Sequence, residues 1–176
     1  MRIYLREIEE DDAKLIVKWR NNANVASHCF TKTVVTEESH NKFYNDFVKT
    51  GKYLQFIVER VEESVGVASY PIATVYLKDI DKNNKRCELC IFTSDDEEWN
   101  TESQSIAIKM LVDKAFDELG MHKIYSYVFA ANENEVKLLE NSGLKKEALL
   151  KEEAIDMHEN YADVYRMSIF RGEQSE

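Results

Sequence analysis

The 176-residue chain has few of the residues that interrupt regular structure, since it contains one proline and five glycines. No glycine stands between Gly66 and Gly120, so this stretch holds no glycine-rich loop. The chain also contains no linker, internal repeat or low-complexity block. We therefore expect one domain over residues 1–170, large enough for a sizeable core, and a frayed tail at 171–176.

Positive charge is in the minority, because 23 lysines and arginines stand against 33 acidic residues and give a net charge of −10. This balance argues against nucleic acid or an anionic membrane surface as a general partner, and it favours a cationic or amine-bearing ligand. No apolar run is long enough to span a bilayer, and the acidic start MRIYLREIEEDD does not have the pattern of a secretory signal. We expect a cytoplasmic protein that is a monomer or a homodimer.

Cysteine is scarce as well, with Cys29, Cys87 and Cys90 as its three examples. An odd number of cysteines in an intracellular chain provides no disulfide framework. Cys87 and Cys90 form a single CxxC within an expected strand, where residues three apart point to opposite faces. No second CxxC and no CxxH follows, so we expect no metal site.

The chain does contain a clear succession of strand and helix patterns. Alternating apolar and polar residues and β-branched runs predict strands at 2–8, 53–60, 65–78, 86–93, 123–129, 144–155 and 160–170. Helical spacing and capping residues predict helices at 13–22, at 37–50, before Gly120 and at 134–142. Pro71 predicts a bulge or an edge position in its strand. The order of elements predicts an α/β (α+β) domain around one mixed sheet.

Several segments in this order resemble the GNAT superfamily of acyl-CoA-dependent N-acyltransferases, and together they cover nearly the whole chain. The matching segments are LREIEEDDAKLIVKWRNN, HNKF, DIDKNNKRCELCIF, AIKMLVDKAFDELGMHKIYSYVFAANENEVKLLENSGLKKEALL and NYADVYRMSIF. The branch that looks most similar contains the ribosomal-protein N-terminal acetyltransferases and the nucleotide-sugar N-acetyltransferases of pseudaminic-acid type. The resemblance implies a mostly antiparallel mixed sheet flanked by helices, and transfer of an acetyl group from acetyl-CoA to a primary amine.

The resemblance also implies where acetyl-CoA binds. In this family the pantetheine arm lies where the fourth and fifth strands separate, and the diphosphate binds N–H groups at the start of the next helix, where the helix dipole favours an anion. The residues that fall at these places are Leu89, Cys90, Ile91, Thr101, Glu102, Ser103, Gln104 and Asn132. Asn132 is also a sound helix N-cap, which is the simpler interpretation of that residue.

Two marks of the family are missing. The family's loop follows roughly Arg/Gln-x-x-Gly-x-Gly, whereas residues 99–104 carry side chains at both glycine positions. The segment SDDEEWNTES also places five carboxylates near the expected diphosphate, and Thr101-x-x-Gln104 is a capping box that would occupy the same N–H groups. Leu139 stands where many members have a tyrosine that protonates the departing thiolate. Leucine cannot donate a proton, so another group does so, water does so, or the step is not performed.

Three residues are candidates for the acceptor side. Glu88 lies in the fourth predicted strand, where relatives carry a glutamate, and burial would raise its pKa toward that of a general base. His40 lies in the second predicted helix, which borders the acceptor site in relatives. Tyr161 lies in the last predicted strand and is a candidate for lining the pocket, as is Tyr165. The simpler interpretations are a half-exposed charged strand residue, a solvent-facing histidine and a core tyrosine.

The sequence thus supports an acetyl-CoA-dependent N-acetyltransferase whose acceptor is a protein N-terminus, an amino sugar or a small amine. The alternative is a degenerate GNAT fold that has lost acetyl-CoA chemistry and acts as a binding or interaction module, as the missing glycines and Leu139 would suggest. A third hypothesis, an acyl donor on a carrier protein, fits poorly with an acidic surface.

Overall fold

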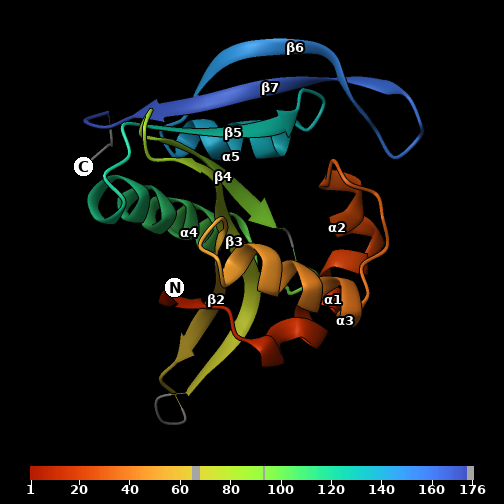
Figure 1. Cartoon of the computed structure of the whole chain (residues 1–176), viewed down its shortest axis with the longest axis vertical. Coiled ribbons are helices and arrows are strands. Elements are labelled where there is room, and N and C mark those ends of the chain that lie inside the picture. The colour runs from red at the N-terminus through yellow and green to blue at the C-terminus, as the bar shows by residue number, and fades with distance from the viewer. Residues whose placement is uncertain (65–67, 93, 174–176) are drawn as a thin grey trace.

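One sheet of seven strands forms the centre of the computed structural model, which describes residues 1–64, 68–92 and 94–173 (Figure 1). The strands are β1 (Ile3–Glu7), β2 (Leu54–Glu62), β3 (Ala68–Asp81), β4 (Arg86–Phe92), β5 (Lys123–Phe129), β6 (Lys145–Ile155) and β7 (Tyr161–Phe170). Their order across the sheet is β1-β2-β3-β4-β5-β7-β6. Every neighbouring pair is antiparallel except β4 and β5, which are parallel. The predicted mixed, mostly antiparallel sheet is confirmed.

Helices pack on both faces of this sheet. They are α1 (Ala13–Asn21), α2 (Ala23–His28), α3 (Glu37–Phe43), α4 (Thr101–Asp113) and α5 (Glu133–Asn141). A 3-10 turn at Glu10–Asp12 leads into α1, and π-helical turns at Tyr44–Val48 and Lys114–Glu118 extend α3 and α4. In residues 1–64, 68–92 and 94–173, no helix has both the length and the apolar character needed to cross a membrane.

The segment before β2 holds three helices, whereas the sequence predicted two. Asn22 ends α1 as expected, but its side-chain oxygen then accepts hydrogen bonds from the N–H groups of Asn24 (2.9 Å) and Val25 (3.4 Å). One asparagine therefore stops one helix and caps the next. The sequence also offers Thr36 as the cap of the helix predicted at 37–50 and Asn132 as the cap of the helix at 134–142. Both caps are confirmed, because their side chains accept from the N–H groups of Ser39 and Glu135.

The two faces of the sheet belong to two separate cores. The larger core joins Leu89 of β4 to Leu111 of α4 and contains Leu139 of α5, which is fully buried. The smaller core lies under α1 and α2. Because successive strand residues point to opposite faces, Cys87 enters the larger core, whereas Glu88 and Cys90 face the side that carries α1–α3. The predicted opposite orientation of Cys87 and Cys90 is confirmed.

Pro71 lies at a β-bulge, as predicted. The register between β2 and β3 shifts there, so that Val58 pairs with Ala73 and Glu59 pairs with Pro71. The pairing of β3 with β4 begins only at Thr74, so Pro71 also has no ladder partner on that side among the described residues. Residues 65–67, with which this strand was predicted to begin, lie outside the described residues.

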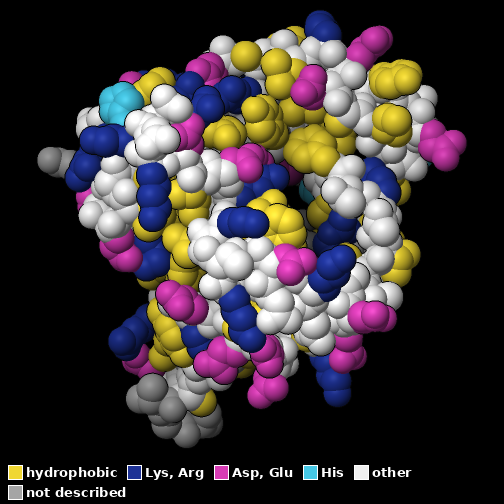
Figure 2. Space-filling model, viewed as in Figure 1, with side chains coloured by type: hydrophobic (Ala, Val, Ile, Leu, Met, Phe, Trp, Pro, Cys, Tyr) yellow, Lys and Arg dark blue, Asp and Glu magenta, His cyan; other side chains and the backbone are white. Residues whose placement is uncertain are grey.

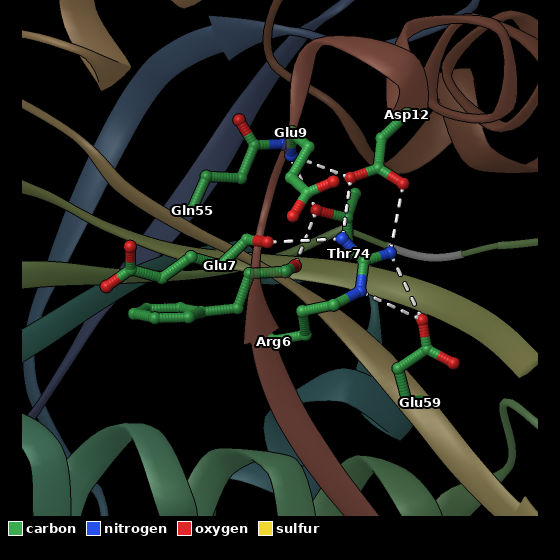
Figure 3. A network of polar contacts seen from close by, with 8 residues as sticks. Arg6, Glu7, Glu9, Asp12, Gln55, Glu59 and Thr74 are labelled. Atoms are coloured by element: carbon green, nitrogen blue, oxygen red, sulfur yellow. Dashed lines mark hydrogen bonds and ion pairs between the residues drawn. The ribbon is translucent and has the colours of Figure 1, made fainter. Parts of the chain in front are cut away.

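A partly buried ion-pair network fixes the start of α1 on the sheet (Figure 3). Arg6 of β1 donates two hydrogen bonds to the carboxylate of Asp12, at 2.9 and 3.0 Å, and a third from Nε to Glu59 of β2 at 3.1 Å. Asp12 also accepts from the N–H of Glu9 at 2.8 Å. Although burial opposes the shift, the hydrogen bonds from Arg6 and Glu9 lower the pKa of Asp12. The sequence offers Asp11 or Asp12 as the cap of α1; Asp12 occupies the N-cap position, but its side chain makes no cap hydrogen bond and instead anchors the turn that precedes the helix.

Part of the tail that was expected to fray is included in the described residues. The N–H of Arg171 donates to the carbonyl of His122 at 2.9 Å, and Glu173 pairs with Lys145 at 3.1 Å. Residues 174–176 lie outside the described residues.

Candidate active site

The two parallel strands β4 and β5 pair only at their first residues. Their ladder ends at the pair Glu88↔Tyr125, although β4 continues to Phe92 and β5 to Phe129. Figure 1 shows the two arrows diverging from this common start. On the other side β4 is paired with β3 as far as Phe92. The backbone of β4 beyond Glu88 is therefore fixed by β3, while its edge toward β5 remains available for another hydrogen-bonding partner.

A cavity of about 450 Å³ opens at this divergence. Its lining comes from strands β2–β5, from α1–α3 with the segment between α2 and α3, and from Glu135 at the start of α5. In Figure 2 a hollow is visible near the centre of the same view, between the helical region and the β6–β7 hairpin. The cavity thus reaches from the splayed strands to the helices that cover the opposite half of the sheet.

Glu88 is the most distinctive charged group in this cavity, since it is only 5% exposed. Burial raises the pKa of Glu88, although the ammonium of Lys78 at 3.3 Å opposes the shift. Burial also raises the pKa of the Cys90 thiol, which keeps its proton and donates it to Glu88 Oε1 at 3.3 Å. A buried carboxylate with a raised pKa is suited to accept a proton from a substrate amine.

The structure brings most of the predicted strand and acceptor residues together. Glu88, Leu89, Cys90, Ile91 and His40 all line this one cavity. His40, for which solvent exposure was the simpler interpretation, is instead 4% exposed.

Tyr161 is not brought to the cavity. It is 72% exposed and pairs with Ile155 at the far end of the β6–β7 ladder. That hairpin extends past the rest of the sheet, so its last residues project away from β4 (Figure 1). The structure therefore does not support the sequence-based assignment of Tyr161 to the acceptor pocket.

Asn132 lies at the mouth of the cavity without lining it. Its side-chain nitrogen is 3.0 Å from Nδ1 of His28 in α2 and donates to Glu135 Oε2 at 2.7 Å. The hydrogen bond with Glu135 raises the pKa of His28, although burial opposes the shift. Phe30 packs on Phe129 nearby, with ring centroids 4.8 Å apart. These contacts bring the end of α2 against the end of β5 and the start of α5.

The four predicted diphosphate residues form the first turn of α4, outside this cavity. The capping box is Asn100 with Ser103, one residue earlier than the predicted pair Thr101 and Gln104. The Asn100 side chain accepts from the N–H groups of Glu102 (3.0 Å) and Ser103 (3.4 Å), and Ser103 Oγ donates to the carbonyl of Glu98 at 2.6 Å. Two N–H groups that an anion would use are thus already occupied.

The acidic segment before α4 is partly neutralised. Glu98 pairs with Arg60 at 2.9 Å, and Asp95 lies 4.0 Å from Lys18. Asp96 accepts from the N–H of Glu98 at 2.9 Å, so it stabilises the turn. The repulsion expected from five carboxylates is therefore reduced by local partners.

Several cavity residues were not identified from the sequence. Gln55 of β2 and Thr74 of β3 are buried polar residues, at 5% and 1% exposure, and Lys78, Tyr76 and Tyr53 accompany them on the same face. The sequence did contain an indication of Gln55 and Thr74, because an uncharged polar side chain inside a strand of otherwise apolar residues needs a buried partner.

A second hollow, of about 550 Å³, adjoins the cavity through their shared residue Tyr53. Asp79, Asp81 and Tyr125 are among its lining residues. Asp81 is engaged with Asn84 and Arg86, whereas Asp79 is exposed.

The family of the chain follows from a comparison of its sequence with known families. Residues 2–145 match the family model described as an acetyltransferase (GNAT) domain. The chain belongs to the GNAT acetyltransferase family. The relatives of this chain are acetyl-CoA-dependent N-acetyltransferases, which agrees with the activity expected from the sequence.

Relatives of this GNAT chain include spermidine N(1)-acetyltransferase of Vibrio cholerae, which is 26% identical over 97% of this chain and 94% of that protein. A crystal structure of the Vibrio cholerae spermidine N-acetyltransferase in complex with CoA and spermine has a TM-score of 0.87 and 27% identity, covering 97% of this chain and 96% of that one. A dodecameric structure of the Vibrio enzyme has a TM-score of 0.78 and 25% identity, covering 96% of this chain and 94% of that one.

The comparison refines two expectations. The superfamily is confirmed, but these relatives are spermidine N-acetyltransferases and not the ribosomal-protein or sugar-amine branch that the sequence suggested. The comparisons also give no support to a degenerate GNAT module.

Proposed function

We propose that this GNAT enzyme transfers the acetyl group of acetyl-CoA to a primary amine of a small polyamine of the spermidine type. The observation that carries the proposal is a buried carboxylate, Glu88, in a cavity at the point where β4 and β5 separate. The similarity to a spermidine N-acetyltransferase crystallised with CoA and spermine, over nearly the full length of both chains, supports the choice of donor and acceptor.

The open edge of β4 fits the donor. Acetyl-CoA supplies an acetyl thioester on an arm that contains amide groups, and the unpaired β4 edge at Leu89, Cys90 and Ile91 offers backbone donors and acceptors to such an arm. N–H groups of this edge would polarise the thioester carbonyl. The start of α4 fits less well, because Asn100 occupies the N–H groups of Glu102 and Ser103. We propose that this asparagine turns away when the diphosphate binds.

Glu88 has the properties of a proton acceptor for the amine. The acceptor arrives mostly as an ammonium, and only its neutral form has the lone pair that attacks a carbonyl. The raised pKa of Glu88 brings its basicity closer to what proton removal near neutral pH requires. The ammonium of Lys78, 3.3 Å from Glu88, would also disfavour a second positive charge nearby and so promote loss of that proton.

The walls of the cavity suit a cationic acceptor. Tyr53, Tyr76 and Phe43 line it, and aromatic faces attract cations within a few ångströms. The net charge of −10 favours the approach of a polyamine in the same way. A nucleotide sugar, in contrast, would bring its own negative charge toward an acidic protein.

A thiol-release assay tests the function. Acetyl-CoA and the purified enzyme are incubated with spermidine, spermine or a simple monoamine, and free CoA and the acetylated amine are both quantified. We expect turnover that depends on the amine and falls strongly in Glu88→Gln. Release of CoA at the same slow rate with and without every amine, by enzyme that binds acetyl-CoA in calorimetry, would contradict the proposal.

The assembly of the chain is a separate question. The sequence-based prediction of a monomer or homodimer stays a prediction, and the dodecameric Vibrio structure makes a larger assembly an equally specific alternative. Mass photometry of the purified chain distinguishes the two directly.

A further inference from the structure

Two polar side chains that line the cavity each carry a buried atom without a hydrogen-bond partner in the described part of the chain: Nε2 of His40 and Oε1 of Gln55. The side chains come from different elements, α3 and β2, and both line the cavity that contains Glu88. Both residues are at least nine-tenths buried, at 4% and 5% exposure. Buried polar atoms are nearly always hydrogen-bonded in folded proteins, so each of these two atoms calls for a polar partner from outside the chain, either a ligand group or a water.

The orientation of the Gln55 amide follows from its neighbour. Thr74 Oγ1 lies 2.8 Å from the carbonyl oxygen of Phe56, which can only accept, so the single hydroxyl proton of Thr74 is committed there. Thr74 must then accept the bond that joins it to Gln55, and the donor at 3.1 Å is the amide nitrogen, Nε2. Figure 3 shows the amide oxygen of Gln55 directed away from Thr74. Gln55 therefore presents a hydrogen-bond acceptor.

His40 adds a second group of matching character. Burial lowers the pKa of His40, although the nearby carboxylate of Asp12 opposes the shift, so the imidazole is neutral near neutral pH. A neutral imidazole has one ring nitrogen that accepts a hydrogen bond. The ring of Phe43 lies 6.3 Å from that of His40, and Tyr53 and Tyr76 line the same cavity. A group with several N–H donors and a positive charge would satisfy these surroundings.

The register of the sheet gives the distance from Gln55 to Glu88. Gln55 pairs with Tyr76, and Tyr76 pairs with Cys90, so Gln55 lies in the row of the sheet next to Glu88 and on the same face. Gln55 and Glu88 are separated by two strand spacings across the sheet and by two residues along it, so their Cα atoms lie roughly 12 Å apart. A group bound by Gln55 therefore lies far from the reacting nitrogen, at the other end of an extended substrate.

We propose that His40 and Gln55 bind a second amino group of the acceptor, and that this subsite selects extended diamines and polyamines over monoamines. The inference rests on the proposed function and assigns its specificity to two named residues. Neither residue removes the proton from the attacking amine. Their role is to hold the far end of the chain, so their contribution grows when the acceptor is long enough to reach them.

The test compares linear diamines of increasing length with monoamines of equal length. For each pair, the ratio of kcat/KM for the diamine to kcat/KM for the monoamine is measured in wild type, Gln55→Met, His40→Leu and the exposed control His158→Leu. We expect the wild-type ratio to rise with chain length and to fall about tenfold or more for long diamines in the first two variants, the loss expected for a hydrogen bond to a charged group. The control should keep the wild-type ratio.

Two results would overturn the inference. One is a wild-type enzyme with the same ratio at every length, which needs no variant and is therefore independent of folding. The other is a ratio that stays unchanged in folded Gln55→Met and His40→Leu but falls in Asp79→Asn, since the far nitrogen would then lie in the neighbouring hollow.

A binding readout separates this inference from the proposed function. Calorimetric titration of wild type and Gln55→Met with a long diamine and its matched monoamine requires no acetyl transfer. If no amine is acetylated but the diamine still binds about tenfold more tightly than the monoamine through Gln55, the proposed function fails and the subsite stands. If amines are acetylated and the two ligands bind equally, the subsite fails and the function stands.

Discussion

The edge of β4 and the start of α4 are both expected to hold acetyl-CoA, yet they differ in how ready they are to do so. The β4 edge beyond Glu88 is left open because the parallel ladder with β5 ends there. The start of α4 is closed, because Asn100 and Ser103 form a capping box over its N–H groups. One end of the expected ligand path is available, and the other is occupied by the chain itself.

The difference reflects how each feature is encoded. The opening between β4 and β5 is a property of strand order and twist, so it survives almost any change of individual side chains. An anion site at a helix start depends on one or two residues, because a single asparagine can satisfy the N–H groups that a phosphate would use. We infer that β4 dominates donor binding in this protein and that the α4 start has a smaller effect.

The largest expected effect concerns Glu88 at the open end. Glu88→Gln keeps the size and burial of the side chain but removes the base, so kcat/KM for the amine should fall about 10²–10⁴-fold. Because the pKa of Glu88 is raised, the wild-type rate should fall on the acid side of neutrality, at a pH above the ordinary value of 4.5. A pH–rate profile with no acidic limb above that value, or a variant within twofold of wild type, would count against this role.

Removing the cap from the start of α4 should have a smaller effect and should tighten the binding of acetyl-CoA. Asn100→Gly removes the side chain from the N–H groups of Glu102 and Ser103, and glycine at an N-cap costs only a few tenths of a kcal/mol. We expect calorimetry to give an affinity for acetyl-CoA about tenfold higher, as for one added charge-assisted hydrogen bond.

The matched control is Thr36→Gly, which removes the cap of α3 instead. Unchanged or weaker acetyl-CoA binding in folded Asn100→Gly would mean that the diphosphate does not use the start of α4.

Removing one acid at the same helix start should matter less. Glu102 lies in the first turn of α4, where its carboxylate pairs with the N-terminal ammonium at 2.7 Å and would repel a diphosphate bound there. Glu102→Gln should raise the affinity for acetyl-CoA a few-fold at low salt, and the gain should disappear near 1 M salt, where the Debye length is about 3 Å. A gain that is independent of salt would indicate a cause other than charge.

The smallest effect concerns the contact of α2 with α5 at the mouth of the cavity. Because Glu135 raises the pKa of His28, this pair stabilises the fold fully below the ordinary value of 6.5, and the stabilisation is lost as the pH rises through the raised value. The His28 side chain is 43% exposed, so the free energy of unfolding should differ between wild type and His28→Ala by about 0.5 kcal/mol or less. Urea unfolding at about pH 6 and pH 8 measures this difference in the free energy of unfolding, which should be larger at pH 6. A larger difference at pH 8 would contradict the stabilising effect of the His28–Glu135 pair at low pH.

The sequence predicted helices and strands better than it predicted which of them lie side by side in the fold. Strand periodicity and Thr36 and Asn132 as caps located most elements, because these signals act over a few residues. The helix α2 was missed because one residue, Asn22, serves both as a stop and as a cap.

The sequence predicted only those residues of the candidate site that lie close together in one segment. Glu88 and its strand neighbours emerged from a single stretch, whereas Gln55 joins His40 only through the fold. The position of Tyr161 away from the cavity was not predictable for the same reason, since nothing local shows how far a hairpin extends beyond its sheet. The capping box was displaced by one residue because Asn100 and Thr101 are both good caps.

A calorimetric titration of the purified chain with acetyl-CoA shows directly whether the open β4 edge binds this donor without a glycine-rich loop. Adenosine diphosphate and desulfo-CoA serve as controls, because the first lacks the pantetheine arm and the second keeps it. We expect micromolar binding of acetyl-CoA and desulfo-CoA and much weaker binding of the nucleotide. Absence of binding at millimolar acetyl-CoA, at both low and moderate salt, would contradict this expectation.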